Sequence, residues 1–267
     1  MQFLGTGNAV PTKQRNHTGI LLSFANENIL VDCGEGIQRQ FKIAGVSPMK
    51  LTRVVITHWH GDHILGLPGL FQTLGMGGYM RTLKVYGPRG TKRNLAVISE
   101  LMQGDFRIDL DIQEVEGGVI AEEKEFILES RPMKHGIPTL GYALILKDRH
   151  RLDKSKLAKY KLPNSPLLKE LQQGKDIVFE GKKIKAKDVS YLEQGKKVAV
   201  ILDTSMHVGA ITLAKNADLL ICESTFALSE EERALDYRHL TATDAATIAK
   251  KAKVKQLLLT HISERYE

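Results

Sequence analysis

The chain contains little cysteine and few aromatic residues. Two of its 267 residues are cysteines, Cys33 and Cys222, and Phe, Trp and Tyr make up 6% of the chain. The two cysteines lie far apart and form no C-x-x-C pair, which excludes a disulfide-stapled fold and a zinc knuckle. Buried free thiols are typical of proteins in a reducing compartment, so we expect a cytoplasmic location.

Long hydrophobic runs are missing as well. No apolar stretch approaches the roughly 20 residues that a membrane-spanning helix needs. The N-terminus, MQFLGTGNAVPTKQRN, lacks a charged segment followed by an apolar core, so the sequence predicts no signal peptide. We therefore expect a soluble protein with no membrane partner.

The composition is that of a globular protein with a basic net charge. Hydrophobic residues make up 42% of the chain, charged residues make up 26%, and the formal net charge is +7. This length and composition suffice for a single large core. A basic surface favours an anionic partner such as nucleic acid, although a merely soluble basic protein has the same balance.

One segment, residues 148–195, differs from the rest of the chain. Residues 148–193 hold twelve Lys and Arg against seven Asp and Glu, a net charge of +5, so most of the chain's +7 lies there. The segment also keeps apolar residues such as Leu171 and Phe179, which a disordered tail would lack. We predict an ordered or semi-ordered insertion that protrudes from a domain spanning residues 1–267; the alternative is a solvated charged loop.

The clearest motif is the run His58-Trp59-His60-Gly61-Asp62-His63. It follows Arg53–Thr57, an apolar and β-branched stretch that predicts a buried strand. His58 and His60 would project to the same side of an extended segment. Gly61 would allow a sharp reversal that brings the next two side chains to a second position nearby. Imidazole nitrogen and carboxylate oxygen are ligands of zinc and similar cations, so the run predicts a metal site.

Three further ligand-type residues lie at or just beyond the end of a predicted strand. His135 comes shortly after Phe126–Ser130, Asp203 follows a strand that ends at Leu202, and His261 follows Gln256–Thr260. In a layered fold such strand ends converge on one edge. The two oxygens of Asp203 could bridge two cations. Two metals about 3.5–4 Å apart can hold a bridging hydroxide for attack at phosphorus, so the set predicts a phosphodiesterase.

These residues resemble the metallo-β-lactamase superfamily, and further motifs resemble the ribonuclease Z family, which removes the 3′ trailer from precursor tRNA. The motifs are FLGTGNAVPTKQRN at 3–16, VDCGEGIQRQ at 31–40, LPGLFQTLGMGG at 67–78, YGPRGT at 86–91 and His239-Leu240-Thr241. The resemblance runs from residue 3 to the end of the chain and is greatest for archaeal members. It implies an α/β fold, a four-layer αβ/βα sandwich.

The resemblance also implies roles for single residues. It implies two zinc ions per chain, with Mn or Mg as possible substitutes: His58, His60 and His135 would bind one, Asp62, His63 and His261 the other, and Asp203 would bridge them. Asp62 would also act as general base, His239 would donate a proton to the leaving 3′ oxygen, and Glu223 would orient His239. The residues expected to contact the substrate are Lys13, Arg15, Asn16 and Thr241.

The basic insertion resembles the family's flexible arm, an exosite that clamps the tRNA elbow. Its net charge of +5 fits phosphate contacts, which come mostly from Lys and Arg. The resemblance implies a homodimer, in which the arm of one subunit serves the site of the other. The arm's usual Gly-Pro pair is absent from Leu162-Pro163-Asn164-Ser165-Pro166, and Cys222 stands where a histidine often precedes the glutamate. Family members continue beyond the position of Glu267, so part of one sheet is expected to be missing.

We therefore expect a zinc-dependent endoribonuclease that uses two-metal hydroxide attack and leaves a 3′-hydroxyl on tRNA. One alternative is a phosphodiesterase acting on small cyclic nucleotides or other diesters, which would have no need of a basic clamp. A second is a non-catalytic RNA-binding protein, for which a complete set of metal ligands would have no role. A lactamase or thiol-ester hydrolase is a third, which the N-terminal loop and the arm disfavour.

Overall fold

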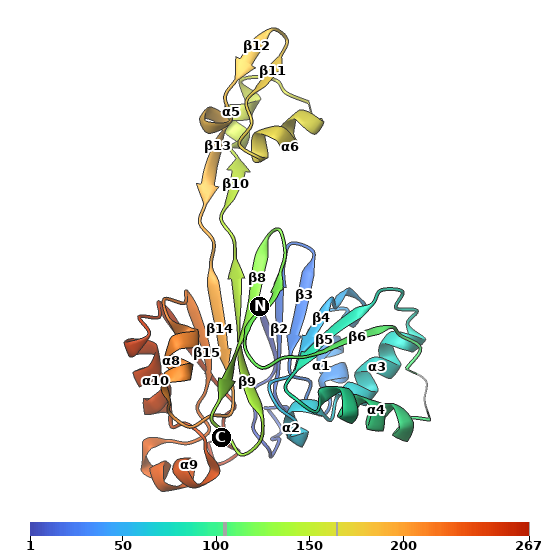
Figure 1. Cartoon of the computed structure of the whole chain (residues 1–267), viewed down its shortest axis with the longest axis vertical. Helices are drawn as coiled ribbons and strands as arrows, with labels where there is room; N and C mark the ends of the chain where they lie inside the picture. The colour runs from blue at the N-terminus through green and yellow to red at the C-terminus, as the bar shows by residue number, and fades with distance from the viewer. Residues whose placement is uncertain (104–105, 164, 267) are drawn as a thin grey trace.

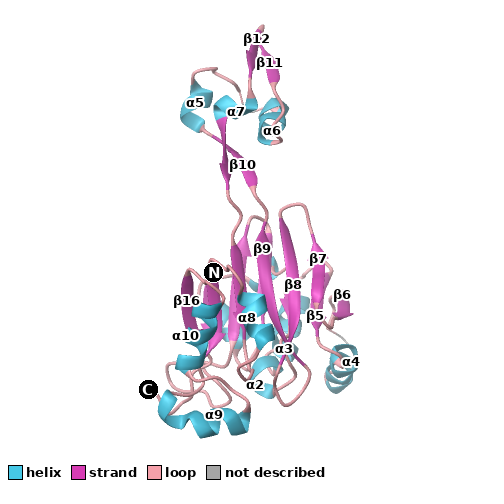
Figure 2. Cartoon of the chain, turned by 60° about the vertical axis from the view of Figure 1, so that its left-hand side comes forward, coloured by secondary structure: helices cyan, strands magenta, loops and turns pink. Residues whose placement is uncertain are grey.

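The computed structural model describes residues 1–103, 106–163 and 165–266. Two mixed sheets face each other, and helices cover the outer face of each (Figures 1 and 2). This arrangement confirms the predicted four-layer αβ/βα sandwich. Asn164, in the stretch that replaces the Gly-Pro pair, and Glu267 lie outside the described residues.

The first sheet follows the order of the chain. Its strands are β1 (Gln2–Gly5), β2 (Gly19–Phe24), β3 (Glu27–Val31), β4 (Arg53–Val55), β5 (Leu83–Gly87) and β6 (Leu110–Glu114). The strands from β1 to β3 pair antiparallel, whereas those from β3 to β6 run parallel. Because parallel strands end on the same side, the segments after β3 and β4 leave the sheet at one edge.

The second sheet has the order β16-β15-β14-β9-β8-β7. Its strands are β7 (Gly118–Glu122), β8 (Phe126–Met133), β9 (Thr139–Leu146), β14 (Lys197–Ile201), β15 (Leu219–Glu223) and β16 (Gln256–Thr260). Strands β14, β15 and β16 run parallel, and β9 is antiparallel to both β14 and β8. The turn between β8 and β9 therefore lies at the same edge as the ends of β14 and β16.

Apolar cores separate the four layers. The first lies between the first sheet and its helices and contains Phe41 and Phe71. The second lies between the two sheets and contains Tyr142, and the third lies under the helices of the second sheet and contains Ile248. The helices and 3-10 turns of the sandwich are α1 (Ile37–Ile43), η1 (Pro48–Lys50), α2 (Gly61–Ile64), α3 (Leu67–Met76), α4 (Thr91–Leu101), α8 (Val208–Ala214), η2 (Leu228–Glu230), α9 (Glu231–Tyr237) and α10 (Ala242–Lys251). Among the described residues, none of the helices has the length and apolar character that crossing a membrane requires.

Between β9 and β14 the chain leaves the sandwich as an arm, residues 148–195. Its elements are β10 (Arg149–Leu152), α5 (Lys154–Ala158), α6 (Pro166–Gln172), β11 (Ile177–Phe179), β12 (Lys182–Ile184), α7 (Ala186–Val189) and β13 (Ser190–Glu193). Strands β10 and β13 pair antiparallel as a stalk. The tip has an apolar core of its own, which includes Leu171, Ile177 and Val189. In Figure 1 the arm extends from the end of the sandwich opposite α2 and α9.

One local prediction is wrong. Gly61 does not make a sharp reversal, because it is the first residue of the short helix α2. Asp62 lies in the first turn of this helix, where a negative charge is favourable. The helical turn, and not a glycine-specific conformation, brings Asp62 and His63 to their positions.

Candidate metal centre

Seven ligand-type side chains meet at one edge of the two sheets, and we call this set the metal centre. They are His58, His60, Asp62, His63, His135, Asp203 and His261. The first four follow β4, and the other three come from the β8–β9 turn and from the segments after β14 and β16. The structure therefore brings together every residue that the sequence suggested as a ligand. Their role as ligands stays a prediction.

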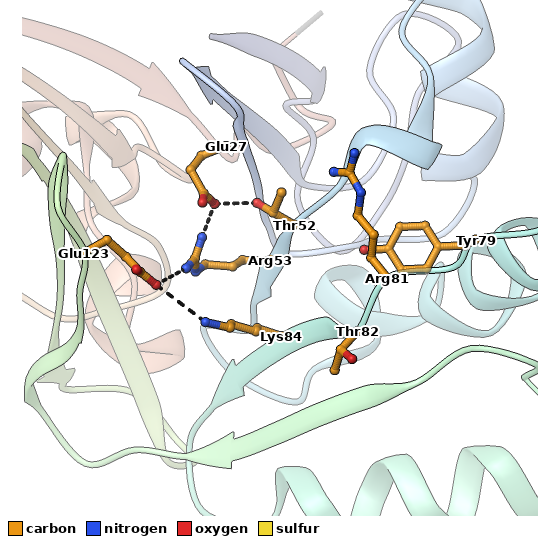
Figure 3. A pocket seen from close by; sticks show the side chains of 8 residues that line it. All are labelled: Glu27, Thr52, Arg53, Tyr79, Arg81, Thr82, Lys84 and Glu123. Carbon is orange, nitrogen blue, oxygen red and sulfur yellow. Dashed lines mark hydrogen bonds and ion pairs between the residues drawn. The ribbon is translucent and has the colours of Figure 1, made fainter. Parts of the chain in front are cut away.

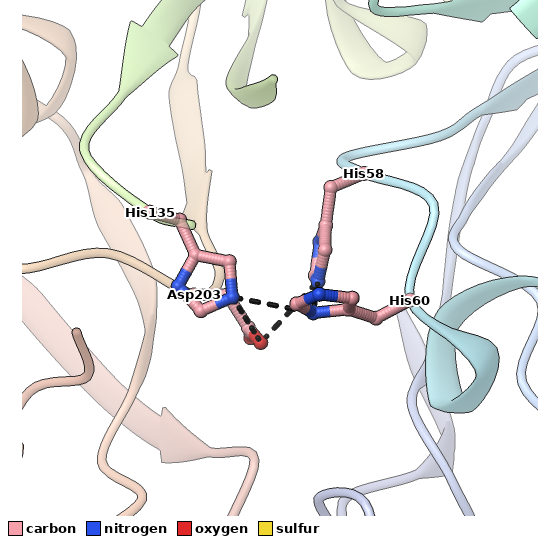
Figure 4. A group of neighbouring side chains, drawn as sticks. All are labelled: His58, His60, His135 and Asp203. Atoms are coloured by element: carbon pink, nitrogen blue, oxygen red, sulfur yellow. Dashed lines mark hydrogen bonds and ion pairs between the residues drawn. The ribbon is translucent and has the colours of Figure 1, made fainter. Parts of the chain in front are cut away.

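The first cluster consists of His58, His60, His135 and Asp203. Figure 4 shows these side chains pointing toward one another from opposite sides of the site. Nδ1 of His60 lies 3.0 Å from Nε2 of His58 and 3.2 Å from Nε2 of His135. Oδ2 of Asp203 lies 3.4 and 3.8 Å from the same two Nε2 atoms. Two ligands on a tetrahedral zinc, with bonds of about 2.0–2.1 Å, lie about 3.3 Å apart, so these distances fit one shared cation.

The second cluster consists of Asp62, His63, His261 and again Asp203. Oδ2 of Asp62 lies 3.2 Å from Nε2 of His63 and 3.3 Å from Nε2 of His261. Oδ1 of Asp203 lies 3.2 Å from Nε2 of His261 and 3.5 Å from Nε2 of His63. Asp203 therefore presents Oδ2 to the first cluster and Oδ1 to the second, as a bridging ligand would.

The shared carboxylate also tests whether a metal fits. Asp203 is 2% exposed, and its Oδ1 is buried without a hydrogen-bond partner among the described residues. A buried oxygen in this state is costly, and each such case needs a physical explanation. A cation between this oxygen and the two facing Nε2 atoms would satisfy all three. The residues of the metal centre thus fit divalent metal ions.

The main chain adopts an unusual conformation at three residues that follow strands. Asp32, Asp203 and His261 have φ angles of 57°, 45° and 55°, in the left-handed region. Each such residue costs about 1–3 kcal/mol, and such strain collects at functional sites. Two of the three are ligand candidates, and the third supports one of them.

Two of the histidines are hydrogen-bonded through Nδ1 to groups outside the clusters. Nδ1 of His63 lies 2.6 Å from Oδ2 of Asp32, and Nδ1 of His135 lies 3.1 Å from the carbonyl oxygen of Arg238. An N–H donated at Nδ1 leaves the Nε2 lone pair for a metal. Asp32 was not predicted as a site residue. Its signal in the sequence is the one that Asp203 gives, a carboxylate directly after an apolar strand.

Burial and neighbouring charges shift the pKa values in the metal centre. Burial, with a smaller effect of His63, lowers the pKa of His58 well below its ordinary value. Burial alone would raise the pKa of Asp62, but hydrogen bonds from His261 and His63 outweigh it and hold this pKa below its usual range. The pKa of Asp203 is likewise lowered, because the surrounding histidines outweigh its burial. Burial alone would lower the pKa of His63, but Asp203 and Asp32 outweigh it and raise this pKa. Two ionised carboxylates beside a neutral His58 imidazole suit a cation site.

His239 lies next to the metal centre but is held by a different carboxylate. Its Nδ1 lies 3.0 Å from Oε2 of Glu223 and 4.0 Å from Oδ2 of Asp203. Burial alone would lower the pKa of His239, but Glu223 and Asp203 raise it to about 9. Glu223 is fully buried, and its Oε1 accepts the backbone N–H of Thr204 at 2.6 Å. A protonated imidazole beside a cation site has the character of a proton donor.

Arg15, expected to contact substrate, has partners inside the protein. Its guanidinium donates to the carbonyl oxygens of Ser263 at 3.2 Å and Tyr266 at 2.6 Å. The Tyr266 hydroxyl in turn accepts the backbone N–H of Ala227 at 2.9 Å. Arg15 therefore anchors the segment that follows His261.

The other residues expected to contact substrate differ in their surroundings. Asn16 donates its side-chain amide to the carbonyl oxygen of Glu35 at 2.7 Å. Thr241 is the N-cap of α10 and forms a capping box with Asp244. Lys13 is exposed. Substrate contact by these residues stays a prediction, and Lys13 has the surroundings that suit it best.

A pocket of about 250 Å³ lies at the opposite ends of β4 and β5 (Figure 3). Arg53 forms ion pairs there with Glu27 and, at 2.6 Å, with Glu123. Lys84 lies 3.5 Å from the same Glu123. Since these charges already neutralise one another, the pocket has the character of a structural ion-pair network.

Known proteins resemble the chain in both sequence and structure. It is 41% identical to ribonuclease Z of Methanothermobacter thermautotrophicus, over 99% of this chain and 87% of that protein. It is 40% identical to ribonuclease Z of Enterococcus faecalis, over 100% of this chain and 87% of that protein. The crystal structure of human tRNase Z, short form, matches with a TM-score of 0.76 and 26% identity, covering 100% of this chain and 93% of that one.

Two further similarities are more limited. A metallo-beta-lactamase fold protein from Bacillus subtilis matches with a TM-score of 0.68 and 20% identity, covering 98% of this chain and 85% of that one, which supports the fold alone. A family model described as Anti-Pycsar protein Apyc1 matches residues 1–106, less than half of the chain.

Proposed function

Because the chain belongs to the ribonuclease Z family, it is an endoribonuclease, and we propose that it removes the 3′ trailer from precursor tRNA with two zinc ions at the metal centre. The observation that carries this proposal is the position of Asp203. Its Oδ2 faces the first cluster and its Oδ1 faces the second. Oδ1 is buried and has no hydrogen-bond partner among the described residues. Two cations, one beside each oxygen of Asp203, would complete such a centre.

The ligand set favours zinc over magnesium or calcium. Five of the seven side chains are histidines, and imidazole suits zinc whereas magnesium and calcium prefer oxygen. When bound, the two ions supply Lewis acidity, since they lower the pKa of water and neutralise charge on the phosphate.

The chain's own residues handle the protons. The general base would be Asp62, whose carboxylate is ionised and whose side chain is 10% exposed beside the second cluster. His239 donates a proton to the 3′ oxygen of the tRNA as that oxygen leaves phosphorus. Glu223 receives Nδ1–H of His239 and so leaves the second ring nitrogen to carry the transferred proton. The tRNA keeps a 3′-hydroxyl, and the trailer keeps the phosphate.

The position of the arm supports a homodimer. Strand β9 runs from Thr139, near the metal centre, to Leu146, near the stalk, and its eight residues span about 26 Å. The stalk then continues away from the sandwich (Figure 1). An arm in this position reaches away from the metal centre of its own subunit. RNA bound by the arm would therefore be cleaved at the metal centre of a second subunit.

The test is to incubate the zinc-loaded protein with a precursor tRNA and map the cut. We expect one cut at the start of the trailer, a 3′-hydroxyl on the tRNA and a 5′-phosphate on the trailer. Mature tRNA and a small cyclic nucleotide serve as control substrates. Hydrolysis of the cyclic nucleotide without cleavage of the precursor would contradict the proposal and favour the small-molecule phosphodiesterase.

A further inference from the structure

A buried threonine lies behind the first cluster. The Thr57 hydroxyl lies 2.6 Å from Oδ2 of Asp32 and 3.0 Å from Nδ1 of His58. Thr57, Asp32 and His58 are each 0% exposed. The backbone N–H of Thr57 also donates to Oδ1 of Asp32 at 2.7 Å, which fixes the carboxylate in place.

A second threonine has the same surroundings behind the second cluster. The Thr225 hydroxyl lies 2.6 Å from Oε2 of Glu223 and 2.8 Å from Nδ1 of His261. Thr225 and His261 are each 1% exposed, and Glu223 is fully buried. A backbone N–H, that of Thr204, fixes Oε1 of this carboxylate as well.

The proton positions follow from the donors that are available. A carboxylate accepts hydrogen bonds, so each threonine must donate its single hydroxyl proton to Asp32 or Glu223. The threonine oxygen is then an acceptor, and the ring nitrogen facing it must carry a hydrogen. His58 and His261 are therefore protonated at Nδ1, and their Nε2 lone pairs face Asp203 and the other ligands.

We propose that Thr57 and Thr225 are matched positioning residues, which fix His58 and His261 in the tautomer that binds metal through Nε2. Each threonine links a buried carboxylate to a histidine through two hydrogen bonds, and we call each such carboxylate–threonine–histidine chain a relay. There is one relay for each cluster. This inference rests on the metal centre of the proposed function and not on the RNA substrate.

The two relays also explain why each carboxylate has two histidine partners. Asp32 binds Nδ1 of His63 directly and reaches His58 through Thr57. Glu223 binds Nδ1 of His239 directly and reaches His261 through Thr225. The first carboxylate thus orients one ligand of each cluster, whereas the second orients a ligand and the proton donor.

The experiment removes each hydroxyl at nearly constant side-chain volume. Thr57→Val and Thr225→Val lose the relay, and Thr57→Ser and Thr225→Ser keep the hydroxyl. Thr212→Val is the matched control, because its hydroxyl bonds only to the carbonyl of Val208 in α8 among the described residues. Metal-free protein is titrated with Zn²⁺ in competition with a chromogenic chelator, so that two affinities are resolved.

Each valine variant should lose about tenfold to a hundredfold in affinity for one zinc ion and little for the other, since partners of metal-binding histidines have effects of this size. The serine variants and Thr212→Val should match the wild type. In ¹⁵N–¹H spectra of the zinc-loaded wild type, His58 and His261 should carry their hydrogen on Nδ1.

Several outcomes would overturn the inference. These are wild-type affinities in both valine variants, serine variants as weak as the valine variants, or hydrogen on Nε2 of either histidine. If a valine variant fails to fold, the wild-type spectra still decide. Intact relays and two bound zinc ions in a protein that does not cut precursor tRNA would refute the substrate and leave the relays standing.

Discussion

Asp203→Ala should abolish cleavage of precursor tRNA and remove both metal ions together. The substitution takes one carboxylate oxygen from each cluster, and that carboxylate would also offset the repulsion between two neighbouring cations. Metal-ion catalysis contributes several kcal/mol, so kcat should fall by about 10³-fold or more. The measurement pairs kcat at saturating precursor tRNA with the metal content of the gel-filtered protein.

The wild type should contain close to two zinc ions per chain, and Asp203→Ala should contain far fewer. Asp62→Ala should lose cleavage too, but it should weaken chiefly the second cluster and leave RNA binding largely intact. Asp236→Ala, the same exchange at an exposed position of α9, is the matched control. Two tightly bound ions in Asp203→Ala would rule out the bridging role.

Replacing residues 150–192 with Asn-Gly should raise KM for precursor tRNA by on the order of 10²-fold, because affinity for RNA depends on phosphate contacts. The deleted residues carry eleven Lys and Arg against five Asp and Glu. Since Arg149 and Glu193 are opposite each other in the stalk, a two-residue turn can join them. Hydrolysis of bis-p-nitrophenyl phosphate should be unchanged.

Charge variants separate loss of the arm from loss of its charge. Lys182, Lys185 and Lys187 changed to Gln should weaken RNA binding and reduce its salt dependence. The same change at Lys250, Lys251 and Lys253, exposed at the end of α10 and just beyond it, serves as the comparison. Equal effects of the two triple variants would show that the arm has no special role.

A mixture of the arm-deleted protein and Asp203→Ala tests whether an arm serves the metal centre of its own subunit or that of the other subunit. The arm-deleted protein keeps its metal centre, and Asp203→Ala keeps its arm. If the arm of one subunit serves the other's site, co-assembled subunits should regain cleavage of precursor tRNA. Failure of the mixture, with dimers present by light scattering, would place the arm with its own site.

The sequence predicts the ligands of the metal centre because each follows or adjoins an apolar run. His58 follows β4 after Ile56 and Thr57, and His261 directly follows β16, so the apolar runs alone place both histidines near strand ends. The four-layer order, in contrast, depends on pairing between distant strands, and it came from the resemblance to a known family and not from the pattern of residues.

The contacts of Thr57, Thr225 and Arg15 around the metal centre could not be predicted, because they depend on which segments lie side by side. Thr225 reaches His261 across 36 positions, and Arg15 reaches Tyr266 across 251. Substrate contact by Arg15 was expected from the resemblance and stays a prediction. The carbonyl partners of Arg15 at Ser263 and Tyr266 are visible only in the tertiary structure.

The apolar core at the tip of the arm shares no residue with the cores of the sandwich among the described residues. Substitutions in the tip can therefore accumulate without disturbing the packing that holds the metal ligands. The proposed RNA-binding arm could then change its RNA preference while the metal centre stays constant. The same modularity would allow the arm of one relative to be grafted onto the sandwich of another at the adjacent stalk residues Arg149 and Glu193.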